Sequence, residues 1–151
     1  MKTFNLNSHL LATAISAALL VGCNSNDHDA PASLAAKTTT RTVLVYMVGS
    51  DLESKGGAAT ADINEMLKVG STENLNIVIT TGGAEKDGWK TVKRYLIPKG
   101  TKTITSIKEL TAIADLGDKN MGDTATLRDF LDWGIKNYSA DKYSLVFWDH
   151  G

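Results

Sequence analysis

The hydrophobic and polar positions of this chain change pattern several times after residue 41. Residues 42–48 form a continuous apolar run rich in β-branched side chains, and residues 75–81 form a second one. Such runs are typical of strands that are buried on both faces. Between them, residues 59–70 carry apolar side chains at helical spacing and end at a glycine, which predicts an amphipathic helix. Strand, helix and strand in this order predict a right-handed βαβ unit.

The pattern in the middle of the chain is less regular. Two short runs, 89–97 and 103–107, flank a Pro-Lys-Gly turn and predict a small antiparallel ribbon off the main sheet. Asp123 then opens a helix with a single apolar stripe, where its side chain is a good N-cap. Residues 143–148 predict a third buried strand. Together these elements predict an α/β fold, a three-layer sandwich around a mostly parallel sheet.

The amino-terminal residues have a different character. Lys2 precedes an apolar stretch, residues 10–21, that is shorter than the about 20 residues needed to span a bilayer as a helix. This stretch suits the hydrophobic region of a secretory signal. The sequence Leu-Val-Gly-Cys ending at Cys23 resembles the lipobox of bacterial lipoproteins. That resemblance implies that Cys23 is lipidated and that the signal is cleaved just before it. An ordinary signal peptide with an incidental cysteine is the alternative.

These patterns divide the chain into three parts. We expect residues 1–22 to be a lipoprotein signal peptide, residues 23–40 the lipidated cysteine with a polar, flexible linker, and residues 41–151 the folded domain. Several acyl chains together hold a protein stably at a membrane. The expected partner is therefore a membrane, reached through the lipid anchor. The expected location is the cell envelope, with the outer membrane or the periplasmic side favoured.

Charge and cysteine content exclude several classes of function. The 16 basic and 17 acidic residues nearly cancel and form no long basic block, which argues against a nucleic-acid partner. A single cysteine excludes an internal disulfide and a paired-cysteine zinc site. The run Asp27-His28-Asp29 lies in the polar linker, where nothing would complete a metal site. We expect neither a metal nor another cofactor.

The end of the third predicted strand carries the sharpest candidate chemistry. Parallel strands bring their carboxyl ends to one edge of a sheet, where ligands bind. His150 follows that strand, and an imidazole can take a proton from a thiol and return it to a leaving amine. Gly151 could direct its N–H into the cleft to stabilise an oxyanion. Asp149 is interpreted as structural, because adjacent residues that leave a strand point apart. The simpler alternative is that polar residues only terminate the strands.

Five segments, taken together and in order, resemble the clostripain-like cysteine peptidases. The resemblance implies a caspase-like fold and a His/Cys dyad that cleaves peptide bonds, in several relatives after Arg or Lys. It matches His150 to the catalytic histidine of the family and Gly151 to the glycine of its oxyanion hole. Ser50 and Asp51 are candidate substrate-binding residues at the presumed cleft, although Asp51 also suits the start of a helix. The segments are 45–54 (VYMVGSDLES), 62–66 (DINEM), 81–83 (TGG), 118–130 (DKNMGDTATLRDF) and 147–151 (FWDHG).

The sequence departs from this family pattern in its nucleophile. In caspases the histidine precedes the catalytic cysteine by about 50 residues, and Cys23 instead precedes the first predicted core strand. We therefore expect the nucleophile beyond Gly151, so that this chain is the amino-terminal part of a caspase-like domain. By itself it should be inactive and should fold poorly. The expected partner of the whole enzyme is a peptide or protein substrate. The alternatives are a non-catalytic binding lipoprotein and a truncated remnant.

Overall fold

The computed structural model describes residues 40–100 and 102–150. The predicted signal peptide, most of the predicted linker, Cys23 and Gly151 therefore lie outside the described residues, and the expectations that concern them remain predictions. Within the described residues, no helix is long and apolar enough to cross a membrane.

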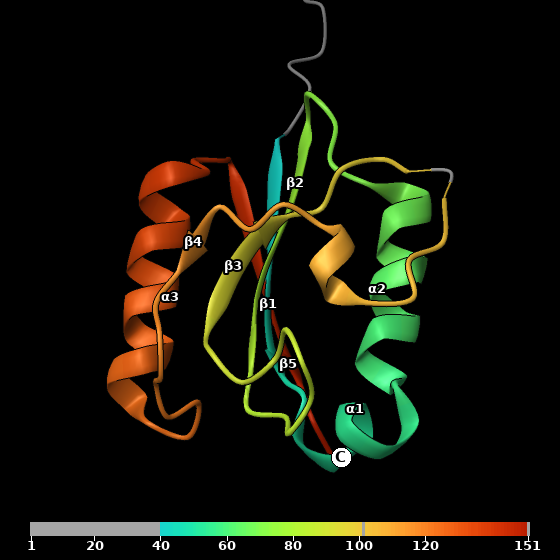
Figure 1. Cartoon of the computed structure of the whole chain (residues 1–151). Helices are drawn as coiled ribbons and strands as arrows, with labels where there is room; N and C mark the ends of the chain where they lie inside the picture. Colours follow the sequence, from blue (N-terminus) through green and yellow to red (C-terminus); the bar gives the residue numbers. More distant parts are fainter. Residues whose placement is uncertain (1–39, 101, 151) are drawn as a thin grey trace, which may run out of the picture. The chain divides into compact units, whose positions relative to one another are not determined.

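A five-stranded mixed sheet forms the centre of the domain, with helices on both faces (Figure 1). Its strands lie in the order β4-β3-β2-β1-β5. Strands β1, β2 and β5 are parallel to one another, while β3 and β4 are antiparallel additions next to β2. The strands are β1 (Arg41–Val48), β2 (Leu75–Gly82), β3 (Lys93–Leu96), β4 (Ala114–Asp115) and β5 (Lys142–Trp148).

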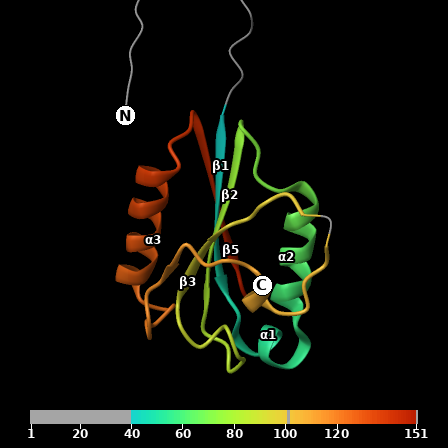
Figure 2. The same ribbon diagram turned by 45° about the horizontal axis from the view of Figure 1, so that its top comes forward.

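The helices divide between the two faces, which gives the three layers that the sequence predicts. Figures 1 and 2 show α3 on one face of the sheet and α1, α2 and the 3₁₀ turn η1 on the other. The apolar face of α2 and the apolar face of α3 each cover one side of β1 and β2, so these two strands are buried on both faces. The helical elements are α1 (Ser50–Gly56), α2 (Ala58–Val69), η1 (Ile107–Glu109) and α3 (Thr124–Asn137).

The predicted antiparallel ribbon is wrong in its position and in its second strand. β3 pairs with β2, with Val78 opposite Leu96, so it extends the main sheet rather than leaving it. Residues 103–107 form no strand. Ile104 is buried in the core beside α2, and the side-chain amide of Asn64 binds both the N–H and the carbonyl of Ile104. One side chain thus replaces the strand partner that the apolar pattern had indicated.

β5 is a strand, as predicted, but it is not buried. Phe147 is 63% exposed, and Tyr143, Leu145 and Val146 are also exposed. The reason is its place in the sheet: β5 pairs with β1 along one edge, and it is the last strand in the order that the described residues form. Its apolar sequence therefore corresponds to a surface that these residues leave open.

Helix α3 begins at the predicted residue, but its cap differs from the expectation. Asp123 occupies the N-cap position with extended backbone, yet its side chain makes no capping hydrogen bond. Its backbone carbonyl accepts from Thr126 and Leu127, while its carboxylate accepts a hydrogen bond from the side chain of Asn120. The turn before the helix uses the carboxylate that would otherwise cap it.

Candidate active site

The carboxyl ends of the three parallel strands meet at one edge of the sheet, as their order predicts. Val48 of β1 lies beside Gly82 of β2, and Met47 lies beside Trp148 of β5. The N–H of Gly49 donates to the carbonyl of Gly82 at 2.8 Å, so the β1–β2 ladder continues past the end of β1. The residues that follow β1 and β5 are thereby brought together although they are about a hundred positions apart in the sequence.

His150 lies at this edge and contacts Asp51. The imidazole Nε2 is 2.7 Å from Oδ1 of Asp51, and the two side chains are about half exposed, at 58% and 49%. The hydrogen bond from His150, followed by that from Lys55, lowers the pKa of the Asp51 carboxyl. Asp51 is not the N-cap of α1, because that position belongs to Gly49. The carboxylate in the first turn of α1 instead lies within hydrogen-bond distance of the imidazole.

Ser50 makes a second link across the same edge. Its hydroxyl donates to Oδ1 of Asp149 at 2.9 Å. Consecutive residues after β5 thus bond to consecutive residues at the start of α1: Asp149 to Ser50, and His150 to Asp51. Ser50 has a φ of +43°, which makes it the one non-glycine residue with positive φ among those described. Backbone strain of this kind is concentrated at functional sites.

A pocket of about 300 Å³ adjoins Asp149. It lies between the ends of β1 and β5 and the start of α3. Its wall is mainly apolar, and its charged groups are the carboxylates of Asp123 and Asp149. It is therefore suited to a side chain with an apolar stem and a cationic or polar end. The pocket is lined by Tyr46, Val48, Met121, Gly122, Asp123, Thr124, Leu127, Phe147, Trp148 and Asp149.

The described residues include His150, the candidate base, but no thiol. Cys23, the single cysteine of the chain, lies outside them, and so does the proposed oxyanion-hole residue Gly151. No group of three or more His, Cys, Asp or Glu side chains is arranged for a metal ion within residues 40–100 and 102–150. The arrangement can accept a proton at one imidazole nitrogen while Asp51 holds the other.

Comparison with known proteins decides the family. The model of the clostripain family of peptidases, Peptidase_C11, matches residues 45–151. The chain belongs to the clostripain family. No curated protein matches it in sequence.

Solved structures of clostripain-family and other cysteine proteases share the fold. One is a B. fragilis cysteine protease, with a TM-score of 0.54 and 24% identity over 74% of this chain and 89% of that one. Another is an inactive zymogen C11 protease from Parabacteroides distasonis, with a TM-score of 0.57 and 27% identity over 76% of this chain. A third is a secreted C11 cysteine protease from Bacteroides thetaiotaomicron in complex with an irreversible peptide inhibitor, with a TM-score of 0.54 and 24% identity over 74% of this chain. This chain spans 32% and 29% of the last two proteins. The caspase-like α/β fold expected from the sequence is confirmed.

Helix α1 was indicated by the sequence only through Asp51, which suits the start of a helix, and its contacts with Asp149 and His150 were not predicted. Its residues are polar and too few to show a helical period. The spacing of Asp51 and Lys55, four residues apart and 3.3 Å between charged atoms, is the one local signal that favours a helix here.

Proposed function

We propose that the whole protein is a clostripain-type cysteine endopeptidase in which His150 is the general base. The observation that supports this most directly is the contact between His150 Nε2 and Asp51 at the carboxyl edge of the parallel sheet. When Asp51 accepts the Nε2–H, Nδ1 carries the lone pair and can accept a proton. We therefore propose that Asp51 orients the imidazole, in addition to the substrate-binding role that the sequence suggests for it.

The proposed reaction needs a cysteine nucleophile, which we place after Gly151 in the whole enzyme. The thiol gives its proton to Nδ1 of His150, and the thiolate attacks the carbonyl carbon of the scissile peptide bond. The N–H of Gly151 is proposed to stabilise the oxyanion that forms. Collapse of this intermediate breaks the C–N bond, and the imidazolium protonates the leaving amine. Water then hydrolyses the thioester with His150 again acting as base.

The pocket beside Asp149 is proposed to receive a substrate side chain. Its two carboxylates, on Asp123 and Asp149, complement a cation, and its apolar wall complements the stem of Arg or Lys. Ser50 holds Asp149 at the rim through its hydroxyl and is proposed to fix that carboxylate for the substrate. This supports a preference for cleavage after Arg or Lys.

Lipidation of Cys23 is proposed to hold the enzyme at the cell envelope. The order of signal, small residues and cysteine supports it, and a secreted relative agrees with export from the cytoplasm. Metabolic labelling with a fatty acid is expected to mark the wild-type protein and not the variant Cys23→Ser. Labelling that persists in Cys23→Ser would rule out this anchor.

The experiment that tests the function uses the full-length protein and a thiol-reactive peptide probe that ends in Arg or Lys. We expect the wild-type protein to be labelled and His150→Ala to remain unlabelled, because the thiol then lacks its base. Asp51→Asn should slow labelling on the order of 100-fold, because a misoriented base loses its alignment. His28→Ala, a histidine of the linker, is the matched control and should label normally. A wild-type protein that is never labelled would contradict the proposal.

A further inference from the structure

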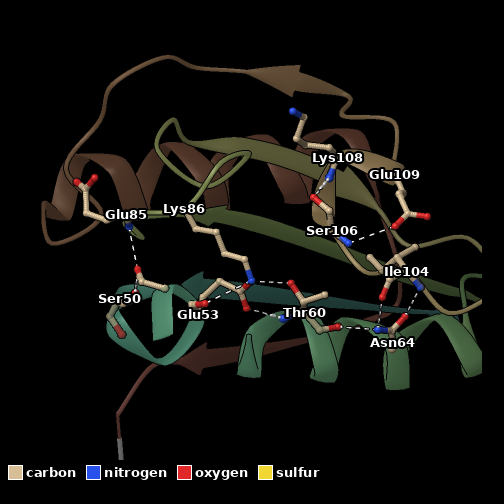
Figure 3. Close-up of polar contacts among 11 residues, drawn as sticks. Ser50, Glu53, Thr60, Asn64, Glu85, Lys86, Ile104, Ser106, Lys108 and Glu109 are labelled. Atoms are coloured by element: carbon tan, nitrogen blue, oxygen red, sulfur yellow. Dashed lines mark hydrogen bonds and ion pairs between the residues drawn. The ribbon is translucent and has the colours of Figure 1, made fainter. Parts of the chain in front are cut away.

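Glu53 is a fully buried carboxylate three residues from the start of α1. Its side chain is 0% exposed and accepts three hydrogen bonds. The backbone N–H of Thr60 donates to Oε2 at 2.8 Å, the hydroxyl of Thr60 donates to Oε1 at 2.7 Å, and the ammonium of Lys86 donates to Oε1 at 2.5 Å. Figure 3 shows these groups meeting between the two helices and the segment that follows β2. Burying a charge of this kind costs free energy unless it is paired and hydrogen-bonded.

The three groups that donate to Glu53 belong to two residues, Thr60 and Lys86, which lie outside α1. Thr60 lies in the first turn of α2, where backbone N–H groups have no partner within the helix and negative charge is favourable. Lys86 lies in the segment between β2 and β3, and its side chain is 35% exposed. Glu53 therefore ties α1 to the beginning of the next helix and to the segment that follows the neighbouring strand.

A second link joins α1 to the same segment. The hydroxyl of Ser54 donates to the carbonyl of Ser50 at 2.7 Å and accepts the N–H of Glu85 at 2.9 Å. Helix α1 thus meets the segment after β2 through two consecutive side chains, Glu53 and Ser54. Asp51, in the first turn of the same helix, contacts His150 instead.

Helix α1 needs such anchoring. It has seven residues, and helices of this length are not stable by themselves in water. Gly57, with φ +67°, ends α1 and starts α2 directly, so the chain turns sharply between the two helices. The direction of α1, and with it the place of Asp51, depends on side-chain contacts. Among these, the buried Glu53 carboxylate makes the most hydrogen bonds.

We propose that the ion pair of Glu53 and Lys86 positions Asp51 against His150. A buried ion pair is weak evidence for added stability, because desolvation offsets much of the attraction, whereas it can fix one geometry among several. Here the ion pair would fix the rotation of the short helix α1, which contacts His150 through Asp51 on its other side. Glu53 and Lys86 are positioning residues that act through Asp51 and touch no substrate. The inference rests on the proposed function of His150.

The main test is the double variant Glu53→Gln/Lys86→Met in the full-length protein. It removes both charges while keeping similar volumes, so no uncompensated buried charge remains. We expect kcat for a peptide with Arg or Lys before the scissile bond to fall on the order of 100-fold, because the proposed base loses its alignment. The single variant Lys86→Arg, which keeps the charge, should retain most of the wild-type kcat. The matched control is Lys90→Met, which removes an exposed ion pair with Glu85 from the same segment and should leave kcat unchanged.

A second measurement follows the geometry without using activity. The carboxyl pKa of Asp51, read by carbon NMR, should rise toward its ordinary value in the double variant because the contact with His150 is loosened. Thr60→Val keeps both charges and removes one hydrogen bond to Glu53, so it tests the same link with a smaller change. It should move the Asp51 pKa in the same direction and lower kcat by a smaller factor.

The outcomes separate the two proposals. A folded double variant with wild-type kcat and an unchanged Asp51 pKa would overturn the positioning role. If the double variant does not fold, Thr60→Val decides, and unchanged values of kcat and of the Asp51 pKa in that variant overturn it. If His150→Ala remains active, the proposed function fails, but the Asp51 pKa still reports whether Glu53 and Lys86 hold α1 in place.

Discussion

Gly49 joins β1 to α1, two residues before Asp51, and it is packed too closely to accept a side chain. A Cβ placed there would lie 2.9 Å from the Cβ of Ala84 and 2.9 Å from Cε3 of Trp89. Trp89 is fully buried, so its ring cannot move away freely. The backbone angles of Gly49, φ −66° and ψ −35°, are ordinary for any residue. The substitution Gly49→Ala therefore tests packing alone, without backbone strain.

The magnitude follows from two opposing effects. Overpacking a filled site costs about 1–3 kcal/mol. Replacing glycine by alanine also reduces the entropy of the unfolded chain, which stabilises the fold by about 0.4–1 kcal/mol. Gly56→Ala is the matched control in the same helix, because nothing lies within 4 Å of a Cβ built there. The entropy gain is common to both variants, so their difference isolates the steric cost of about 1–3 kcal/mol.

The assay is urea unfolding of the full-length wild-type protein and the two variants. We expect Gly56→Ala to be more stable than the wild type and Gly49→Ala to be less stable. Two variants of equal stability, or a Gly49→Ala variant that is the more stable one, would show that Ala84 and Trp89 yield easily. The close packing that we assign to the junction of β1 and α1 would then be wrong.

Further predictions concern the core and the response to acid. Phe130→Ala, at a fully buried position of α3, should cost about 3–5 kcal/mol of unfolding free energy. Ile135→Ala, at an exposed position of the same helix, is its control and should change stability by less than about 0.5 kcal/mol. The backbone N–H of Thr105, then Lys102, lowers the pKa of Glu109 from 4.5 to about 2, so its contribution is full above pH 4.5 and is lost as the pH falls toward 2. Glu109→Gln should remove that part of the pH dependence of urea unfolding, and an unchanged acid profile would contradict it.

The elements that the sequence predicts correctly are those whose pattern directly reflects packing. The runs that became β1 and β2 are apolar because helices cover both faces, and the stripe of α3 is apolar because it lies on the sheet. Residues 103–107 were mistaken for a strand because Ile104 and Ile107 are apolar for another reason. They fill the space beside α2, with the side chain of Asn64 satisfying the backbone of Ile104. The spacing of apolar residues thus indicates which positions are buried, but not which element their backbone pairs with.

The site is predictable in part for the same reason. His150 stands directly after a strand, so the topology alone brings it to the sheet edge where β1 ends. Its contact with Asp51 depends on the direction of α1, which a positive φ at Ser50 and a buried Glu53 set. Neither feature leaves a periodic trace in the sequence. The contact of His150 with Asp51 therefore could not be predicted from the sequence pattern and is seen only in the structure.

The contact between Asp51 and His150 can form only late in the synthesis of the chain. A ribosome makes β1 and Asp51 first, but β5 pairs with β1 across about a hundred residues of intervening chain. Pairing over such a separation forms late and slowly compared with local structure. A growing chain thus contains Asp51 long before His150, the proposed base, can reach it. In the proposed peptidase, the geometry that aligns His150 would therefore be complete only after β5 has joined the sheet.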